Sequence, residues 1–279
     1  MTTVSTALTL STSELPVVDG AYRTGPRRIA WVARTFPTLM FFLRLTWIVF
    51  RSASKAKWST YDGRAWAESS LEVLRALESV GVEFEVTGRE HLENVDGACL
   101  IVGNHMSTLE TMILPCIVQP IRNVTFVVKQ ALVDYPVFKH VMRSRDPIAV
   151  SQSDPRGDLK LMLRGGLERL GKGISLVVFP NGQRRLHFDP GTFNSIGVKL
   201  ASRADVPIVP VALRTDAWAL GRIITDFGKI DPTKKVHFAF GPPLKVARRG
   251  VVENEAIIQF VGEHLRGWGV DVRSDAASV

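Results

Sequence analysis

Cysteine is scarce in this chain of 279 residues: it has two, Cys99 and Cys116, and no cluster of cysteine and histidine surrounds either one. This scarcity excludes a disulfide-stapled scaffold and argues against a structural zinc site or a secreted protein. Hydrophobic residues make up 46% of the sequence and charged residues 22%. That balance excludes a disordered or fibrous chain and predicts one sizeable buried core.

Acidic residues are scarce at one end of the chain. Residues 1–60 hold two acids, Glu14 and Asp19, against eight basic residues, so this segment carries +6 of the net charge of +8. A basic surface usually faces nucleic acid or an anionic membrane. The eight basic residues are Arg23, Arg27, Arg28, Arg34, Arg44, Arg51, Lys55 and Lys57.

The chain also lacks a long uninterrupted apolar run. Residues 29–50 are long enough to span a bilayer, but Arg34 and Arg44 interrupt this stretch and Pro37 breaks it. An arginine near the centre of a spanning helix costs about 2.5–3.5 kcal/mol. We therefore expect a kinked helical hairpin that lies in the membrane interface. A single spanning helix and a buried core helix remain open as alternatives.

Three tryptophans favour the interfacial interpretation, because the indole ring prefers the headgroup level of a membrane. They are Trp31, Trp47 and Trp58, and the basic residues around them would meet anionic lipid. Nucleic acid is not expected as a partner, since residues 39–42 would be an apolar surface with no reason to face phosphates. The expected location is the cytoplasmic face of the cell membrane, as a peripheral or monotopic protein.

Beyond residue 60 the pattern alternates between strands and helices. Unbroken apolar runs at 98–103 and 174–179 are typical of strands buried on both faces. The alternation predicts an α/β fold in which helices flank a mostly parallel sheet. Further strands are expected at 82–87, 124–129, 147–150, 206–213 and 236–240, and helices at 68–80, 159–170, 193–204 and 253–268.

The expected organisation is a flexible tail at 1–28, a membrane-contact helical segment at 29–60 and an α/β domain at 61–279. In open α/β sheets, ligands bind where the loops converge at the carboxyl ends of the strands. This rule points to the residues that follow 98–103 and 174–179.

The first of these loops contains His105 and Glu110. A regular helix would place them about 140° apart. Ser107 and Glu110 match the S-x-x-E capping box, however, which would turn Glu110 back toward the loop. The carboxylate would then orient the imidazole of a general base; a plain cap beside a hydrogen-bonded loop histidine is the alternative. Since no G-x-S-x-G motif offers a nucleophile, direct transfer to an acceptor hydroxyl is expected.

The second loop reads Phe-Pro-Asn-Gly-Gln-Arg-Arg from residue 179. Gly182 permits a tight turn and a close backbone approach to a ligand. Arg184 and Arg185, at the end of a strand, could bind a phosphate through paired hydrogen bonds. A surface loop with solvated arginines is the alternative.

Together these motifs resemble the glycerolipid acyltransferase family, the PlsC-like lysophosphatidate acyltransferases. The family's V-P-[IV]-V-P-V stretch also has a match at residues 206–211. The resemblance implies acyl transfer from acyl-CoA or acyl-carrier protein to a lysophospholipid, with a histidine base and neither metal nor cofactor. Its N-H-x-S-x-x-D block is matched by Asn104, His105, Ser107 and Glu110, and its F-P-E-G-T-R block by Phe179, Pro180, Gly182 and Arg184.

The chain departs from the family pattern at three motif positions. Glu110 replaces the usual aspartate, Asn181 the usual glutamate and Gln183 the usual threonine. The first change lengthens the reach of the carboxylate and keeps its charge. The other two affect recognition of the acceptor.

A third family block, which lies between these two, is not clear in the sequence. Its arginine would fall at Ser151, and Arg145 or Arg156 is the candidate substitute. Lys129 resembles the family's lysine before a helix. These positions bear on the phosphate of the acceptor headgroup more than on the acyl-transfer chemistry.

The expected function is an acyltransferase that acylates the free hydroxyl of a lysophospholipid such as 1-acyl-glycerol 3-phosphate at an anionic membrane surface. His105 would be the base and Glu110 its partner. The alternatives are the same chemistry on an aminolipid, a glycolipid or glycerol 3-phosphate, and a non-catalytic membrane-associated lipid-binding protein. The expected substrate-binding residues are Asn104, Ser107, Lys129, Arg156, Asn181, Gly182 and Arg184.

Overall fold

The computed structural model describes residues 15–58, 60–134, 139–151, 153–221, 224–247 and 249–273. Within these residues the chain builds one sheet of eight strands in the order β1-β2-β8-β7-β3-β6-β4-β5. The strands are β1 (Ala21–Arg23), β2 (Phe84–Thr87), β3 (Leu100–Gly103), β4 (Val124–Lys129), β5 (Ile148–Val150), β6 (Ser175–Val178), β7 (Ile208–Arg214) and β8 (Val236–Phe240).

The sheet is mostly parallel, as the sequence predicts. Strands β7, β3, β6, β4 and β5 are paired in parallel in that order. Strand β8 pairs antiparallel with β7, and β2 is parallel to β8, so these two run against the central strands. The carboxyl ends of the five parallel strands therefore lie along a single edge of the sheet, where the loops can form a site.

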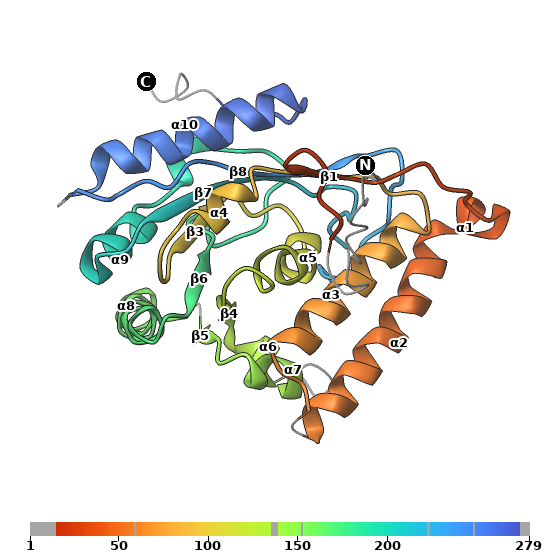
Figure 1. Ribbon diagram of the computed structural model, residues 1–279, viewed down its shortest axis with the longest axis horizontal. Coiled ribbons are helices and arrows are strands. Elements are labelled where there is room, and N and C mark those ends of the chain that lie inside the picture. The colour runs from red at the N-terminus through yellow and green to blue at the C-terminus, as the bar shows by residue number, and fades with distance from the viewer. Residues whose placement is uncertain are drawn as a thin grey trace, which may run out of the picture.

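Helices cover both faces of the sheet (Figure 1). Helices α8, α9 and α10 lie on one face, and α5, α3 and α2 lie on the other. The bounds are α1 (Trp31–Thr35), α2 (Pro37–Lys57), α3 (Gly63–Glu78), α4 (Glu90–Glu93), α5 (Leu109–Val118), α6 (Gln130–Asp134), α7 (Lys139–Ser144), α8 (Pro155–Gly171), α9 (Ile196–Ala204) and α10 (Val251–Gly267), with a short 3-10 helix at Pro190–Thr192.

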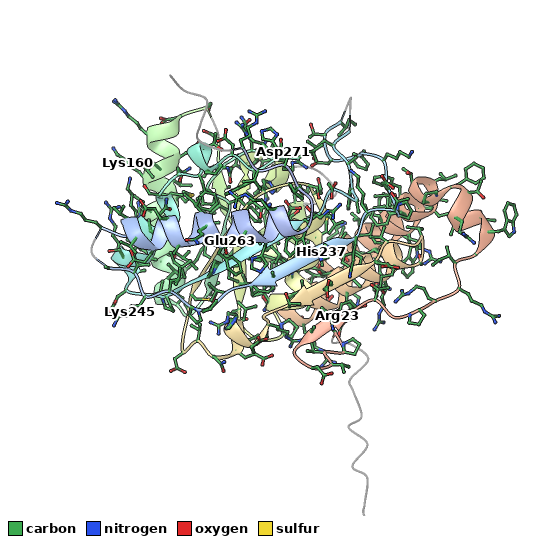
Figure 2. All side chains as sticks on the ribbon, turned by 90° about the horizontal axis from the view of Figure 1, so that it is seen from above. Arg23, Lys160, His237, Lys245, Glu263 and Asp271 are labelled. Atoms are coloured by element: carbon green, nitrogen blue, oxygen red, sulfur yellow. The ribbon has the colours of Figure 1, made fainter. Side chains whose placement is uncertain are left out.

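Successive residues of the central strands belong in turn to two hydrophobic cores, one on each face of the sheet. Ile101 of β3 joins the core beneath α2, α3 and α5, whereas Leu100 and Val102 join the core beneath α8, α9 and α10. This is the period of two of a strand buried on both faces, and it explains the unbroken apolar run. The view in Figure 2 looks onto α10, with His237 of β8 next to it and Lys160 of α8 at the end of the molecule remote from α1 and α2.

Residues 15–28 differ from the flexible tail expected at 1–28. Residues 1–14 lie outside the described part of the chain, but residues 15–28 are attached to the domain. Strand β1 pairs with β2, and Glu78, 2% exposed, accepts hydrogen bonds from Tyr22 Oη at 2.6 Å, Thr24 Oγ1 at 2.6 Å and Arg27 Nη1 at 2.7 Å. A buried carboxylate without partners is costly, so Glu78 fixes this segment in place.

The segment 29–60 breaks where Pro37 predicts. Helix α1 has five residues, and α2 starts at Pro37 and runs for 21 residues. The expected helical hairpin is not confirmed, because its first arm is little more than one turn. Phe41, Leu45 and Ile48 form the buried face of α2. No helix in the described ranges is both long and apolar enough to cross a bilayer.

Candidate active site

The ends of β7, β3 and β6 bring together three loops that are far apart in the sequence. These strands are neighbours in the sheet and are paired in parallel. The loops that follow them begin at Asn104, Phe179 and Thr215. The two motif loops therefore meet, as the rule of carboxyl strand ends predicts.

Asn104 fixes the loop after β3 to the end of β7. Its Nδ2 donates to the Leu213 carbonyl at 2.8 Å, and its Oδ1 accepts from the Leu213 N–H at 2.9 Å. Asn104 is 4% exposed. Because both ends of the amide bond the backbone of Leu213, Asn104 orders the loop, and its contact with substrate stays a prediction.

Glu110 is fully buried and accepts hydrogen bonds from several donors. Oε1 lies 2.8 Å from His105 Nδ1, 2.6 Å from the Met106 N and 2.9 Å from the Ser107 N. Oε2 accepts from Thr215 Oγ1 at 2.6 Å. Burial alone raises the pKa of Glu110, but the hydrogen bonds from His105, Thr215 and Ser107 outweigh it and hold that pKa below its usual value. Glu110 is therefore a carboxylate at neutral pH.

His105 is oriented by this carboxylate. Because Nδ1 faces an ionised acceptor, it carries the proton, and Nε2 has no hydrogen-bond partner among the described residues. The imidazole stacks on the Phe179 ring, with centroids 4.5 Å apart and planes 4° from parallel. The Arg185 N–H donates to the His105 carbonyl at 2.9 Å. Both motif loops therefore hold the His105 imidazole in place, and its Nε2 can accept a proton.

The capping box is present in altered form, so the cap and the His–carboxylate pair coexist. Helix α5 begins at Leu109, two residues after Ser107. Glu110 accepts from the Ser107 N–H as predicted, while the Ser107 hydroxyl accepts from the Leu109 N–H at 3.1 Å. Ser107 is 0% exposed and also contacts the Thr215 carbonyl at 2.9 Å. Ser107 supports Glu110, and its predicted role in substrate binding stays a prediction.

The Arg184 guanidinium lies at the start of α5. Its Nη1 donates to the Thr108 hydroxyl and forms an ion pair with Asp226. Gly182, with φ +66°, makes the turn that allows this, and its N–H donates to the Phe179 carbonyl at 3.0 Å. Asn181 Nδ2 donates to Thr192 Oγ1 at 2.9 Å, and its buried Oδ1 has no partner among the described residues.

Residues 83–214, which contain both motif loops, match the family model described as Acyltransferase. This part of the chain is an acyltransferase domain. The family predicted from the motifs is therefore confirmed.

The acyltransferase domain has curated relatives and a structural neighbour. The chain is 31% identical over 147 residues to the 1-acyl-sn-glycerol-3-phosphate acyltransferase of Pseudomonas aeruginosa, covering 53% of this chain and 54% of that protein. It is 29% identical over 159 residues to a chloroplastic 1-acyl-sn-glycerol-3-phosphate acyltransferase of Brassica napus, covering 57% of this chain and 43% of that protein. The chain thus spans about half the length of the curated relatives it matches.

The fold of the acyltransferase domain has a solved counterpart. The crystal structure of the 1-acyl-sn-glycerophosphate (LPA) acyltransferase PlsC from Thermotoga maritima matches with a TM-score of 0.61 at 19% identity. The match covers 85% of this chain and 95% of that one. At this level of identity, the match shows a shared fold.

Two further predicted substrate residues of the acyltransferase domain lie apart from the His105 loop. Lys129 is exposed at the carboxyl end of β4, the strand beyond β6, and Arg156 is exposed in the first turn of α8. Within the described residues, no hydrogen bond or ion pair joins either side chain to His105 or Arg184. Arg145 lies before β5, at the opposite edge of the sheet, with its guanidinium over Trp66.

Sequence reasoning missed three side chains of the acyltransferase domain and its flanks: Thr108, Thr215 and Asp226. Thr215 follows β7, so the rule that ligands bind at the carboxyl ends of the strands would have indicated it if the rule had also been applied to β7. Asp226 lies on the long connection between β7 and β8, where no local pattern marks it. Within the described ranges, no group of three acidic, histidine or cysteine side chains is placed to hold a metal ion.

Proposed function

We propose that this protein is an O-acyltransferase that moves a fatty acyl group from a thioester donor to the free hydroxyl of 1-acyl-glycerol 3-phosphate. The observation that carries the proposal is the His105–Glu110 pair, with 2.8 Å between Nδ1 and Oε1 and with Nε2 without a hydrogen-bond partner among the described residues. The names of the Pseudomonas and Brassica relatives support the choice of acceptor. Acyl-CoA and acyl-carrier protein are the two candidate donors.

In the proposed reaction, His105 Nε2 removes the proton of the acceptor hydroxyl while its oxygen attacks the thioester carbonyl carbon. Glu110 stabilises the imidazolium that forms, as a buried carboxylate does in other histidine-based acyl transfer. The tetrahedral intermediate then collapses with cleavage of the carbon–sulfur bond. The imidazolium returns its proton to the departing thiolate, so the enzyme ends in its starting state.

Arg184 is the proposed ligand of the acceptor phosphate. Its partner Thr108 is three residues after His105, and its neighbour Arg185 is hydrogen-bonded to the His105 carbonyl. A small acceptor could therefore place its phosphate at Arg184 and its hydroxyl at His105. Lys129 is proposed as a further cation near the same edge of the sheet, and Arg156, on α8, as a more distant one.

Membrane contact is proposed for α1 and α2. Leu39, Leu43, Trp47 and Phe50 are 57–61% exposed and lie on one side of α2, at spacings of four, four and three residues. Trp31 and Trp58 are more than 70% exposed near the two ends of this segment. An exposed apolar stripe among basic residues fits the interface of an anionic membrane on the cytoplasmic side.

The test is to incubate the purified protein with 1-acyl-glycerol 3-phosphate and either acyl-CoA or acyl-carrier protein, and to follow the product by mass spectrometry. We expect diacylated phosphate product, and we expect His105→Ala to lower turnover by a factor of about 10²–10⁴. Glycerol 3-phosphate, an aminolipid and a glycolipid serve as competing acceptors. Turnover that survives His105→Ala would refute the mechanism, and exclusive use of another acceptor would refute the substrate.

A further inference from the structure

The connection between β7 and β8 places a carboxylate against Arg184. Asp226 Oδ1 accepts hydrogen bonds from Arg184 Nη1 and, at 2.9 Å, from the Thr108 hydroxyl. Arg184 Nη1 also donates to the Thr108 oxygen. These contacts close a ring of three side chains from three separate segments: the start of α5, the loop after β6 and the connection 215–235.

The ring uses only Nη1 of the guanidinium, so the edge formed by Nε and Nη2 is not part of it. Both contacts are made by Nη1, whereas Nε and Nη2 have no hydrogen-bond partner among the described residues. The Arg184 side chain is 16% exposed. A planar guanidinium binds phosphate best through two parallel N–H groups, and the Nε–Nη2 edge provides such a pair.

Asp226 is itself held in place. Its carbonyl accepts from Trp218 Nε1 at 3.1 Å, and Trp218 is 1% exposed. The next residue, Phe227, packs on Phe42 of α2 with ring centroids 5.4 Å apart, and Phe42 in turn packs on Trp218 at 5.7 Å. The backbone that carries this carboxylate is therefore anchored to the body of the protein, and the carboxylate itself, 40% exposed, is held by Arg184 and Thr108.

We propose that Asp226 is a positioning residue that fixes Arg184 through Nη1 and presents its Nε–Nη2 edge to the phosphate of the acceptor. This inference rests on the proposed function and deepens it. A contrary role, in which Asp226 occupies the phosphate site until substrate displaces it, would require the carboxylate on the edge that the structure leaves open. The two roles predict opposite changes in KM.

The test is Asp226→Asn, which keeps the shape of the side chain and removes its charge. We expect the KM for 1-acyl-glycerol 3-phosphate to rise about tenfold, with little change in kcat or in the KM of the acyl donor. A phosphate-free 1-acylglycerol should show no such rise. Asp226→Glu, which restores the charge, should recover part of the loss. The matched control is Asp231→Asn, on the same connection, where the carboxylate bonds Thr233.

A double substitution tests whether Asp226 acts through Arg184. Asp226→Asn should add nothing to the KM of Arg184→Lys, because the residue being positioned has already been replaced. An unchanged or lower KM in Asp226→Asn, additive effects, or equal damage with the phosphate-free acceptor would overturn the inference.

Binding of sn-glycerol 3-phosphate, measured by calorimetry, separates this inference from the proposed function. Weaker binding by Asp226→Asn than by the unaltered protein supports the positioning role even if neither protein turns over a lysophospholipid. Equal binding refutes it even if turnover is observed.

Discussion

Replacement of Glu110 by glutamine tests whether a charge, and not only an acceptor oxygen, is needed behind His105. An amide with its oxygen in the Oε1 position keeps the hydrogen bonds of His105 Nδ1, Met106 N and Ser107 N. Its NH₂ then faces the hydroxyls of Thr215 and Ser107, 2.6 and 3.0 Å from the present Oε2, and both hydroxyls can turn to accept. The second contact of the Ser107 N–H, 3.0 Å to Oε2, is lost, but this N–H keeps its bond to the Oε1 position. The geometry and the histidine tautomer therefore survive, and the main loss is the negative charge.

The magnitude follows from that loss. A hydrogen bond to a charged group contributes about 1.5–3 kcal/mol and a neutral one about 0.5–1.5 kcal/mol. The difference, about 1–2 kcal/mol in the transition state, predicts that kcat falls about 5–30-fold. Glu110→Asp keeps the charge but shortens its reach, so it should retain some turnover. Product formation under saturating donor and acceptor measures the effect.

The control is Glu78→Gln, since Glu78 is a second buried carboxylate with three hydrogen-bond donors, and it is not part of the site. Both variants should be less stable in urea denaturation, but Glu78→Gln should keep its kcat.

The pKa of Glu110 is held below its usual value, so its contribution to stability is present above the unfolded pKa and is lost as the pH falls through the folded pKa. Full turnover in Glu110→Gln would mean that the carboxylate is only a cap.

Three further predictions concern other parts of the molecule. Arg184→Lys should raise the KM for a phosphorylated acceptor about tenfold, because lysine cannot copy the bidentate geometry; equal damage with a phosphate-free acceptor would count against the headgroup role. Replacement of both Leu43 and Trp47 by serine should weaken sedimentation of the protein with anionic vesicles without lowering the melting temperature, since both side chains are exposed. Undiminished vesicle binding would show that this apolar stripe of α2 is not the membrane contact. Burial, with help from the charge of Lys235, lowers the pKa of His237 to about 4, so stability should decrease as the pH falls from the unfolded pKa toward 4, by about 3 kcal/mol in all. His237→Gln should flatten this slope in denaturation at successive pH values, and an unchanged slope would contradict the assignment.

The sequence predicts most of what depends on local pattern. The buried runs become β3 and β6, Pro37 starts α2, and the S-x-x-E spacing brings Glu110 back to His105. Each of these outcomes depends on residues close together in the chain, whose steric and polar preferences can be read directly. The unbroken apolar runs predict that β3 and β6 are strands buried on both faces, and the structure pairs them in parallel, so their carboxyl ends meet.

The sequence does not reveal the parts that depend on distant partners. Asn104 and Ser107 match motif positions, but their polar atoms are used by Leu213, Thr215 and Glu110, which pattern alone cannot show. Asp226 reaches Arg184 only because the β7–β8 connection is packed on α2. Residues 15–28 look like a tail because their partner, Glu78, is more than fifty positions away.

The Glu78 contacts also determine how α1 and α2 are mounted on the protein. Arg27, just before α1, is tied to the last residue of α3, and the end of α2 leads within a few residues to the start of α3 at Gly63. Both ends of the α1–α2 segment are therefore fixed to the same helix, and the buried face of α2 lies between them. These attachments hold the described residues of α1 and α2 in one orientation relative to α3. A bilayer that touched the exposed stripe would meet the sheet at one fixed angle. The approach of a lipid to His105 would therefore depend on the orientation of the protein on the bilayer as well as on its affinity.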